Sequence, residues 1–245
     1  MAVLPHEGTH SIMYGPWPIP IGSGLRTGYL ARPDAAGRFP VVIVLPTLDG
    51  LSGFEKDICR MFARSGVVAI GLDFYRQKGD PLEAYDHLSD SRALTDLDEV
   101  HEYIDSDDVS WAVSSDLGLL GLDVGGRFGI VAAATRPWVK ALAVASAPLT
   151  GDDDRQYQVA QYLDHLPVPV LGIYGANDEL IDASTVDEAQ RRNEHGLWIL
   201  YDGAGHNFLD IDGELYNADA AADAGPRLVD FFKTALPKAV EVDLG

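Results

Sequence analysis

The sequence predicts an α/β fold built on a mostly parallel sheet with helices on both faces. Short apolar runs of strand length alternate with segments of helical period along the chain. The apolar runs are rich in β-branched residues and lack polar alternation, which is typical of strands buried on both faces. No linker, repeat or low-complexity segment interrupts this order. We therefore expect a single α/β domain over residues 1–245, without a cap domain.

Each element follows from its local pattern. Phe54, Ile58, Met61 and Phe62 share one helical face, and Gly66 stands where a helix would be capped. Residues 11–33 differ because two apolar segments flank a Pro/Gly-rich piece, which indicates an antiparallel ribbon at the sheet edge. The expected strands are 41–46, 67–73, 117–122, 141–148, 168–175 and 197–203. The expected helices are 53–66, one carrying Leu94 to Ile104, 126–135, one within 155–164, 183–193 and a last one carrying Leu228 to Leu236.

Composition excludes several classes of protein. Eighteen Lys+Arg against 38 Asp+Glu give a formal net charge of −20, which repels nucleic acid and anionic lipid. Cys59 is the single cysteine, so the chain has no internal disulfide and no thiolate zinc cluster. The apolar runs are too short to cross a bilayer, and the first residues lack a signal-peptide pattern. We expect a cytoplasmic monomer or homodimer that acts on a small molecule.

A Gly-x-Asp-x-Gly pattern over residues 121–125 lies between an expected strand and an expected helix. This is the spacing of a nucleophile elbow, in which glycines permit a tight strand-to-helix turn. The turn would hold the Asp123 side chain at the helix N-terminus. The backbone amide of Val124 would then point to where negative charge develops.

Two further residues complete a catalytic order. Asp178 follows a later expected strand, and His206 follows the last one. In a parallel sheet these strand ends meet at one edge, where ligands bind. The order nucleophile, acid, histidine predicts a triad of Asp123, Asp178 and His206.

Longer segments carry a family signal: LPTLDGLSGFEKDICRMFARSGVVAIGLDFYR, GLDVGGRFG, GIYGANDELI, YDGAGHNFLD and YNADAAADAGPRLVDFFKTAL. From about residue 11 to residue 237 the chain resembles the dienelactone hydrolase family of α/β-hydrolase-fold enzymes. The resemblance implies a hydrolase without cofactor or metal. It also implies an oxyanion hole formed by the amides of Leu48 and Val124.

The chain departs from the family pattern at two positions. Asp123 stands where the family normally has a cysteine nucleophile. Thr47 stands where the family usually has a glutamate that positions the cysteine. A glutamate beside an aspartate would be a like-charge pair, so the two changes are consistent with a site rebuilt around a carboxylate. Thr47 is expected to leave Asp123 without a neighbouring anion.

An aspartate at the elbow admits several reactions. Attack on a lactone or ester carbonyl would give an anhydride, whereas attack on saturated carbon gives an ester that histidine-activated water hydrolyses. Epoxide hydrolases and haloalkane dehalogenases resemble this chain at the elbow and use the second route. Asp123 and His206 would alternatively move protons in a lyase, isomerase or cyclase. A small-molecule-binding pseudoenzyme is a third hypothesis.

Other polar residues near strand ends are candidates for substrate binding: Thr47, Asp49, Arg76 and Arg127. Arg127 would equally serve as an ion-pair partner within the elbow helix. Residues 6–10 match the zinc-protease pattern His-Glu-x-x-His, but the pattern requires a helix, and Pro5 with Gly8 disfavours one. We therefore expect no metal site there.

Overall fold

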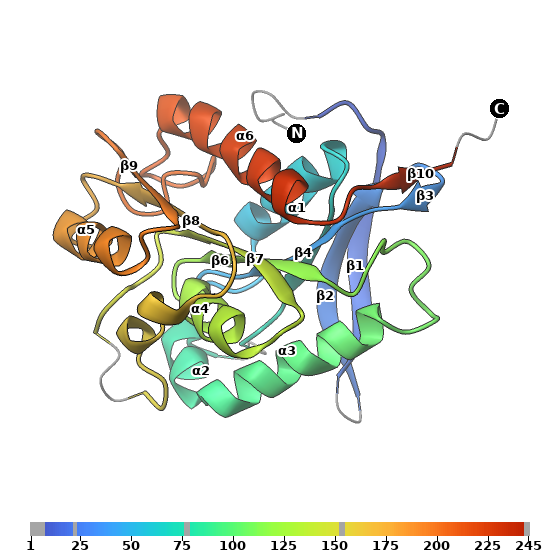
Figure 1. Ribbon diagram of the computed structural model, residues 1–245, viewed down its shortest axis with the longest axis horizontal. Coiled ribbons are helices and arrows are strands. Elements are labelled where there is room, and N and C mark those ends of the chain that lie inside the picture. Colours follow the sequence, from blue (N-terminus) through green and yellow to red (C-terminus); the bar gives the residue numbers. More distant parts are fainter. Residues whose placement is uncertain (1–7, 22–23, 76–78, 152–154, 243–245) are drawn as a thin grey trace.

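The computed structural model describes residues 8–21, 24–75, 79–151 and 155–242. Its main feature is an eight-stranded sheet in the order β1-β2-β5-β4-β6-β7-β8-β9 (Figure 1). These strands are β1 (Ile12–Ile21), β2 (Gly24–Pro33), β4 (Val41–Leu45), β5 (Val68–Leu72), β6 (Leu117–Leu122), β7 (Val139–Ala145), β8 (Val170–Gly175) and β9 (Leu197–Tyr201). Two short strands, β3 (Gly37–Arg38) and β10 (Val240–Glu241), pair separately.

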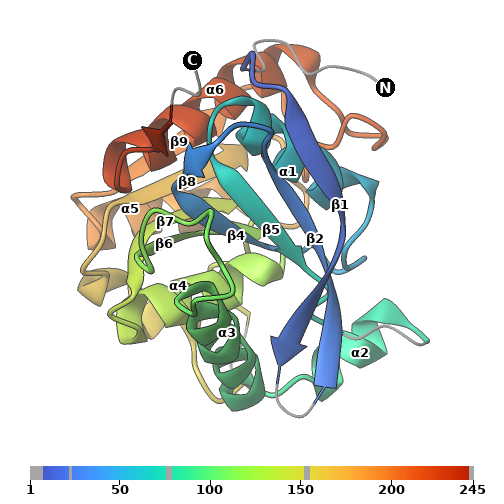
Figure 2. The same ribbon diagram turned by 90° about the vertical axis from the view of Figure 1, so that its right-hand side faces the viewer.

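The direction of the strands confirms the predicted mostly parallel sheet. Strands β5, β4, β6, β7, β8 and β9 run parallel to one another. The β1–β2 ribbon pairs antiparallel with the β5 edge, as the Pro/Gly-rich segment predicted (Figure 2). Strand order reverses between neighbouring β4 and β6, and such a switch point opens a crevice at the carboxyl ends of the strands.

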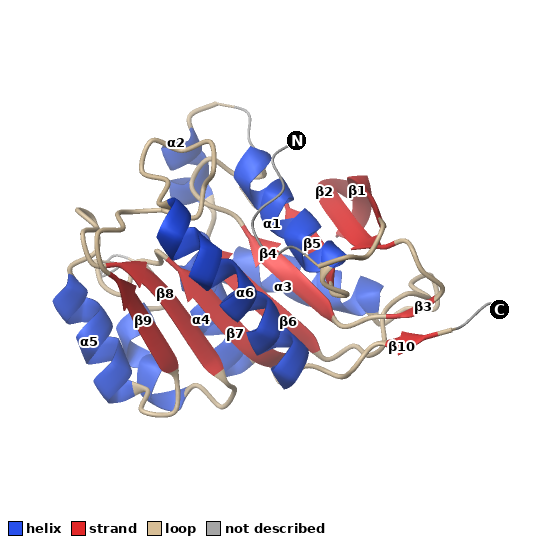
Figure 3. Ribbon diagram, turned by 90° about the horizontal axis from the view of Figure 1, so that it is seen from above, coloured by secondary structure: helices blue, strands red, loops and turns tan. Residues whose placement is uncertain are grey.

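Helices cover the sheet in two layers (Figure 3). Helices α1 (Gly53–Arg64) and α6 (Ala218–Ala235) pack on one face through a core that includes Phe62 and Phe232. Helices α3 (Asp90–Ile104), α4 (Gly125–Thr135) and α5 (Ala183–Arg192) pack on the other face. The strands between the layers are almost fully buried, which explains their unbroken apolar runs.

Two segments differ from the sequence prediction. Helix α2 (Pro81–His87) has no buried residue, so its sequence lacks the apolar stripe that would predict a helix. The helix expected within 155–164 is instead two 3₁₀ turns, Val159–Gln161 and Leu163–His165. Leu166 is extended because Pro167 follows it, and this ends the helical stretch. Apart from residues 152–154, these turns are the only helical structure between β7 and β8, so the described chain has no cap there.

No helix within the described ranges is both long and apolar enough to cross a membrane.

Candidate active site

The predicted elbow is present directly after β6. Asp123 has a left-handed backbone with φ of 47°, which is unusual for a residue with a side chain. Its N–H donates to the carbonyl of Ala145 at 2.9 Å, so the neighbouring strand β7 holds the turn. The carboxylate is partly buried, with 13% of the side chain exposed. The strained turn therefore presents one carboxylate at the start of α4.

Glycines make the close packing of this elbow possible. A Cβ atom on Gly125 would lie 2.4 Å from the carbonyl oxygen of Pro46, which directly follows β4. A Cβ on Gly121 would lie 2.3 Å from the Cα of Gly126. Neither contact tolerates a side chain, so the pattern Gly-x-Asp-x-Gly-Gly brings the elbow directly onto the segment after β4.

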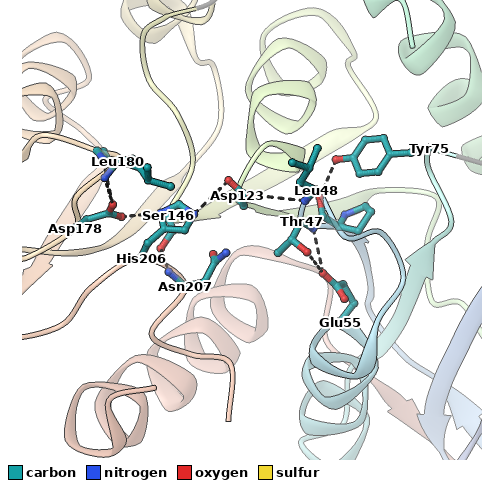
Figure 4. Close-up of polar contacts among 12 residues, drawn as sticks. Thr47, Leu48, Glu55, Tyr75, Asp123, Ser146, Asp178, Leu180, His206 and Asn207 are labelled. Carbon is teal, nitrogen blue, oxygen red and sulfur yellow. Dashed lines mark hydrogen bonds and ion pairs between the residues drawn. The ribbon is translucent and has the colours of Figure 1, made fainter. Parts of the chain in front are cut away.

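That segment supplies the first predicted oxyanion-hole amide. The Leu48 N–H donates to Oδ2 of Asp123 at 3.2 Å (Figure 4). Val124, the other predicted donor, directly follows Asp123 and is the N-cap of α4. The Leu48 amide, which is expected to bind a substrate oxyanion, is therefore hydrogen-bonded to the carboxylate of Asp123.

The structure also brings the other two residues of the predicted triad to Asp123. Nε2 of His206 lies 3.4 Å from Oδ1 of Asp123, and Nδ1 of His206 lies 2.9 Å from Oδ2 of Asp178 (Figure 4). The Asp178 side chain has no exposed surface, and its Oδ1 accepts the N–H groups of Leu180 and Ile181. Asp178 is therefore fixed by backbone donors and bonds the imidazole with its remaining oxygen.

The two carboxylates set the protonation of His206. Burial lowers the pKa of this imidazole, but hydrogen bonds to Asp123 and Asp178 outweigh burial, and the net pKa is raised from 6.5. A protonated imidazole donates to both carboxylates. A neutral imidazole with its proton on Nδ1 keeps the bond to Asp178 and leaves Nε2 free to accept a proton.

Backbone contacts join the loops that carry Asp178 and His206. Asn177 binds the other loop twice, by its N–H to the carbonyl of Ala204 at 2.9 Å and by its Oδ1 to the N–H of Gly203 at 3.1 Å. The Ser146 hydroxyl accepts the N–H of Asn207, which follows His206, at 3.1 Å. Ser146 and Asn207 each have a φ of 50°. Together with Asp123 they are the only non-glycine residues in the described ranges with positive φ, and all three lie at this site.

A buried glutamate that the sequence prediction missed lies beside the segment after β4 that carries Thr47 and Leu48. The Glu55 carboxylate accepts the N–H of Thr47 at 3.0 Å and the hydroxyl of Thr47 at 2.8 Å. Glu55 has no exposed surface and Thr47 only 6%. The Thr47 hydroxyl thus bonds to Glu55. A second carboxylate lies close to the Asp123 site, contrary to the expectation that Thr47 leaves Asp123 without a neighbouring anion. The pattern Ser52-x-x-Glu55 signals a capping box, but nothing in it reveals the contact to Thr47.

The remaining candidates lie elsewhere. Arg127 is 3% exposed and pairs with Asp90 of α3 at 2.6 Å, which favours the ion-pair alternative over substrate binding. Asp49 is exposed and lines a cavity of about 250 Å³ that none of the triad residues lines. Arg76 lies outside the described residues, as do His6 and Glu7 of the zinc-protease match.

The family model of the dienelactone hydrolase family matches residues 27–236. The chain belongs to this family. A candidate carboxymethylenebutenolidase of Escherichia coli K12 is 31% identical over 245 residues, which cover 91% of this chain and 88% of that protein. A candidate 2-oxo-3-(5-oxofuran-2-ylidene)propanoate lactonase of Bradyrhizobium is 30% identical, with 81% and 85% coverage.

Solved structures of the dienelactone hydrolase family agree with this assignment. The crystal structure of a candidate dienelactone hydrolase of Klebsiella pneumoniae is 28% identical, has a TM-score of 0.81, and is matched over 91% of this chain and 98% of that one. The protein is thus a dienelactone hydrolase-like hydrolase with the predicted α/β-hydrolase fold.

Proposed function

We propose that this protein is a cofactor-independent hydrolase of a small organic substrate. In this proposal Asp123 is the nucleophile, His206 activates water and Asp178 orients the imidazole. The observation that carries it is the placement of the two Asp123 oxygens. Oδ2 accepts the Leu48 amide at 3.2 Å, while Oδ1 lies 3.4 Å from Nε2 of His206.

This placement favours attack on electrophilic saturated carbon, such as an epoxide carbon. An oxyanion hole stabilises catalysis when its donors face the oxygen on which charge develops. Here the Leu48 amide already faces an oxygen of Asp123. A substrate carbonyl would have to displace that oxygen. In displacement at saturated carbon the charge develops instead on the leaving oxygen, which lies on the side of the carbon opposite Asp123 and does not need the Leu48 amide. The Leu48 amide would then bond to the carbonyl oxygen of the ester that Asp123 forms with the substrate.

The first step forms that ester. Oδ1 of Asp123 bonds to the epoxide carbon, the ring C–O bond breaks, and the ring oxygen takes a proton from solvent. The ester carbonyl oxygen is then Oδ2, which remains on the Leu48 amide.

The second step hydrolyses the ester. Water bonds to Cγ of Asp123 as Nε2 of His206 takes its proton, and the Leu48 amide stabilises the charge on Oδ2. The Cγ–Oδ1 bond then breaks, and the departing product oxygen takes the proton from His206. Loss of one proton to solvent restores the carboxylate, which now carries the water oxygen.

A lactone is the second candidate substrate, because the names of the relatives include butenolide- and furan-derived lactones. Asp123 would then attack the lactone carbonyl and form an anhydride. This route requires the Asp123 carboxylate to break its hydrogen bond with the Leu48 N–H first, so that the amide can bind the carbonyl oxygen of the lactone.

Single turnover in oxygen-18 water tests the proposal, after a panel of epoxides and lactones has identified a substrate. The covalent route at saturated carbon places the label in the Asp123 peptide, and the first product is unlabelled. With an epoxide, label in the product alone indicates direct attack by water. Conversion without any label indicates a lyase, isomerase or cyclase, and tight binding without conversion indicates a binding protein. The last three outcomes contradict the proposal.

A His206→Ala variant sharpens this test. It should form the ester but not hydrolyse it, so the intact mass of the protein should rise by the mass of the substrate. The exposed His195 provides the matched control, because it precedes β9 whereas His206 follows that strand, so His195→Ala removes an imidazole at the opposite end of β9. His195→Ala should turn over like the unmodified protein and accumulate no adduct.

A further inference from the structure

We propose that Glu55 is a positioning residue that aims the Leu48 amide at Asp123. The geometric part of this inference concerns only the Leu48–Asp123 hydrogen bond. Its catalytic consequence rests on the proposed function.

The Glu55 carboxylate makes more contacts than a helix cap requires. Its Oε2 accepts the N–H of Ser52 at 2.8 Å and the Ser52 hydroxyl at 2.6 Å, which completes the capping box of α1. Its Oε1 accepts the Thr47 N–H and hydroxyl at 3.0 and 2.8 Å. The two bonds from Thr47 are not part of the capping of α1. They fix the residue that directly precedes Leu48 (Figure 4).

The backbone groups on either side of Thr47 are also held. The Tyr75 hydroxyl donates to the carbonyl of Pro46 at 2.9 Å. The Gly50 N–H donates to the carbonyl of Thr47 at 2.9 Å. Burial, together with the nearby charge of Asp123, raises the pKa of Tyr75 well above its usual value, so its hydroxyl remains a donor.

These contacts determine where the Leu48 N–H points. The Thr47 carbonyl and the Leu48 N–H belong to one planar peptide unit, so their directions are coupled. Gly50 holds the carbonyl end of that unit, and Glu55 holds the Thr47 N–H and side chain before it. The Leu48 N–H is left directed at Oδ2 of Asp123. Release of Glu55 would free rotation at Thr47 and with it the peptide unit.

The chemistry of the four donors requires a carboxylate at position 55. Two N–H groups and two hydroxyls face the Glu55 oxygens, and an ionised carboxylate only accepts hydrogen bonds. A glutamine would turn an NH₂ group toward one donor pair. Glu55→Gln therefore disrupts one side of the arrangement while it conserves size.

The sequence allows the Leu48 amide to be observed alone. Thr47-Leu48 is the only Thr-Leu pair in the chain. Carbonyl-carbon-13 threonine combined with nitrogen-15 leucine thus gives a single correlated amide resonance. Asp123→Ala removes the acceptor and defines the position of this resonance without the hydrogen bond. Glu55→Gln and Glu55→Ala should each produce about half or more of that upfield displacement, because hydrogen bonds weaken steeply when their geometry degrades.

Ser52→Ala is the matched control. It removes the capping hydroxyl but leaves both bonds from Thr47 to Glu55, so the Leu48 resonance should stay near its original position. An unmoved Leu48 resonance in folded Glu55 variants would overturn the inference. Equal displacement by Ser52→Ala would also overturn it, because the whole cap rather than the Thr47 contact would then be responsible.

Thr47→Val keeps the test decisive if the Glu55 variants do not fold. It removes one donor to Glu55, and carbonyl-labelled valine reveals Leu48 as one added Val-Leu resonance. The same upfield displacement is expected, and its absence contradicts the inference.

Substrate experiments then separate the inference from the proposed function. With a converted epoxide, Glu55→Gln should slow ester hydrolysis more than ester formation, so the covalent adduct should accumulate. If no variant ever forms an adduct, the proposed function fails while the resonance result stands. If adduct forms and Glu55→Gln hydrolyses it at the normal rate, the positioning role is wrong.

Discussion

Two carboxylates without exposed surface flank Asp123, and they are bonded in different ways. Asp178 uses one oxygen for the backbone of Leu180 and Ile181 and the other for His206. Glu55 uses both oxygens for the neutral donors of Thr47 and Ser52. Asp178 therefore faces a group that changes charge, whereas Glu55 faces only groups that do not.

The difference separates two tasks of a buried anion. A carboxylate bonded to an imidazole stabilises its protonated form and selects its tautomer. A carboxylate saturated by neutral donors changes no protonation state but fixes the backbone that supplies those donors. Substitutions on the two sides should therefore have different signatures.

Asp178→Asn should have the largest effect on the reaction. The variant leaves the side-chain shape intact but presents His206 with an amide, which no longer stabilises the required tautomer or charge. We expect kcat to fall by about 10³- to 10⁴-fold, as for the equivalent change in a serine triad. Steady-state kinetics on a converted substrate measures the loss. A fall of less than tenfold would mean that Asp178 does not orient the imidazole.

Thr47→Glu should have the largest effect on the fold. It replaces the hydroxyl donor to Glu55 with a second buried carboxylate, and an uncompensated buried charge costs about 3–5 kcal/mol. Denaturant unfolding measures the loss. Adding Glu55→Gln should recover much of it, because the like-charge contact is removed. A double variant no more stable than Thr47→Glu alone would show that the two carboxyls do not meet.

The pH dependence should follow His206. Its pKa is raised in the folded protein, so protonation stabilises the fold at low pH, and that contribution is lost as pH rises above 6.5 through the folded pKa. Activity has the opposite trend, because only neutral His206 takes a proton from water. The rate should rise with a midpoint above 6.5, and Asp178→Asn should move the His206 midpoint downward in a proton NMR titration. An upward movement would contradict the assigned contact.

Ser52→Ala should have the smallest effect. Loss of the N-cap hydroxyl costs about 1 kcal/mol of stability. Because the Thr47 contacts to Glu55 remain, kcat should be unchanged. Thermal unfolding and kinetics on the same preparation check both halves of this prediction. A matching loss of activity would show that the N-cap of α1 and the segment that carries Leu48 act as one unit.

The sequence predicts the fold well because the features that specify it are local. Buried strands such as β4 and β6 have unbroken apolar runs, and amphipathic helices such as α1 have periodic ones. The strand-end positions of Asp123, Asp178 and His206 follow from the same order. Helix α2 is missed because its residues are not buried, although Asp80 before Pro81 is a recognisable helix start.

The remaining site features depend on contacts that local patterns do not record. Arg127 finds its partner Asp90 on another helix, 37 residues away in the sequence. The sequence identifies Glu55 only as a capping residue, because its contact with Thr47 depends on the position of the loop after β4. Both are buried charges whose partners are set by tertiary structure, and neither pattern distinguishes a structural role from a catalytic one.

The left-handed backbone at Asp123, Ser146 and Asn207 has a consequence for thermal resistance. Such conformations cost of the order of 1–3 kcal/mol each when the residue carries a side chain, and glycine adopts them without that penalty. A lineage selected only for heat tolerance would thus drift toward glycine at these positions and lose the carboxylate, the hydroxyl and the amide together. Heat tolerance in this molecule is better sought in α2 or α5, where exposed positions can change without touching the strained turns.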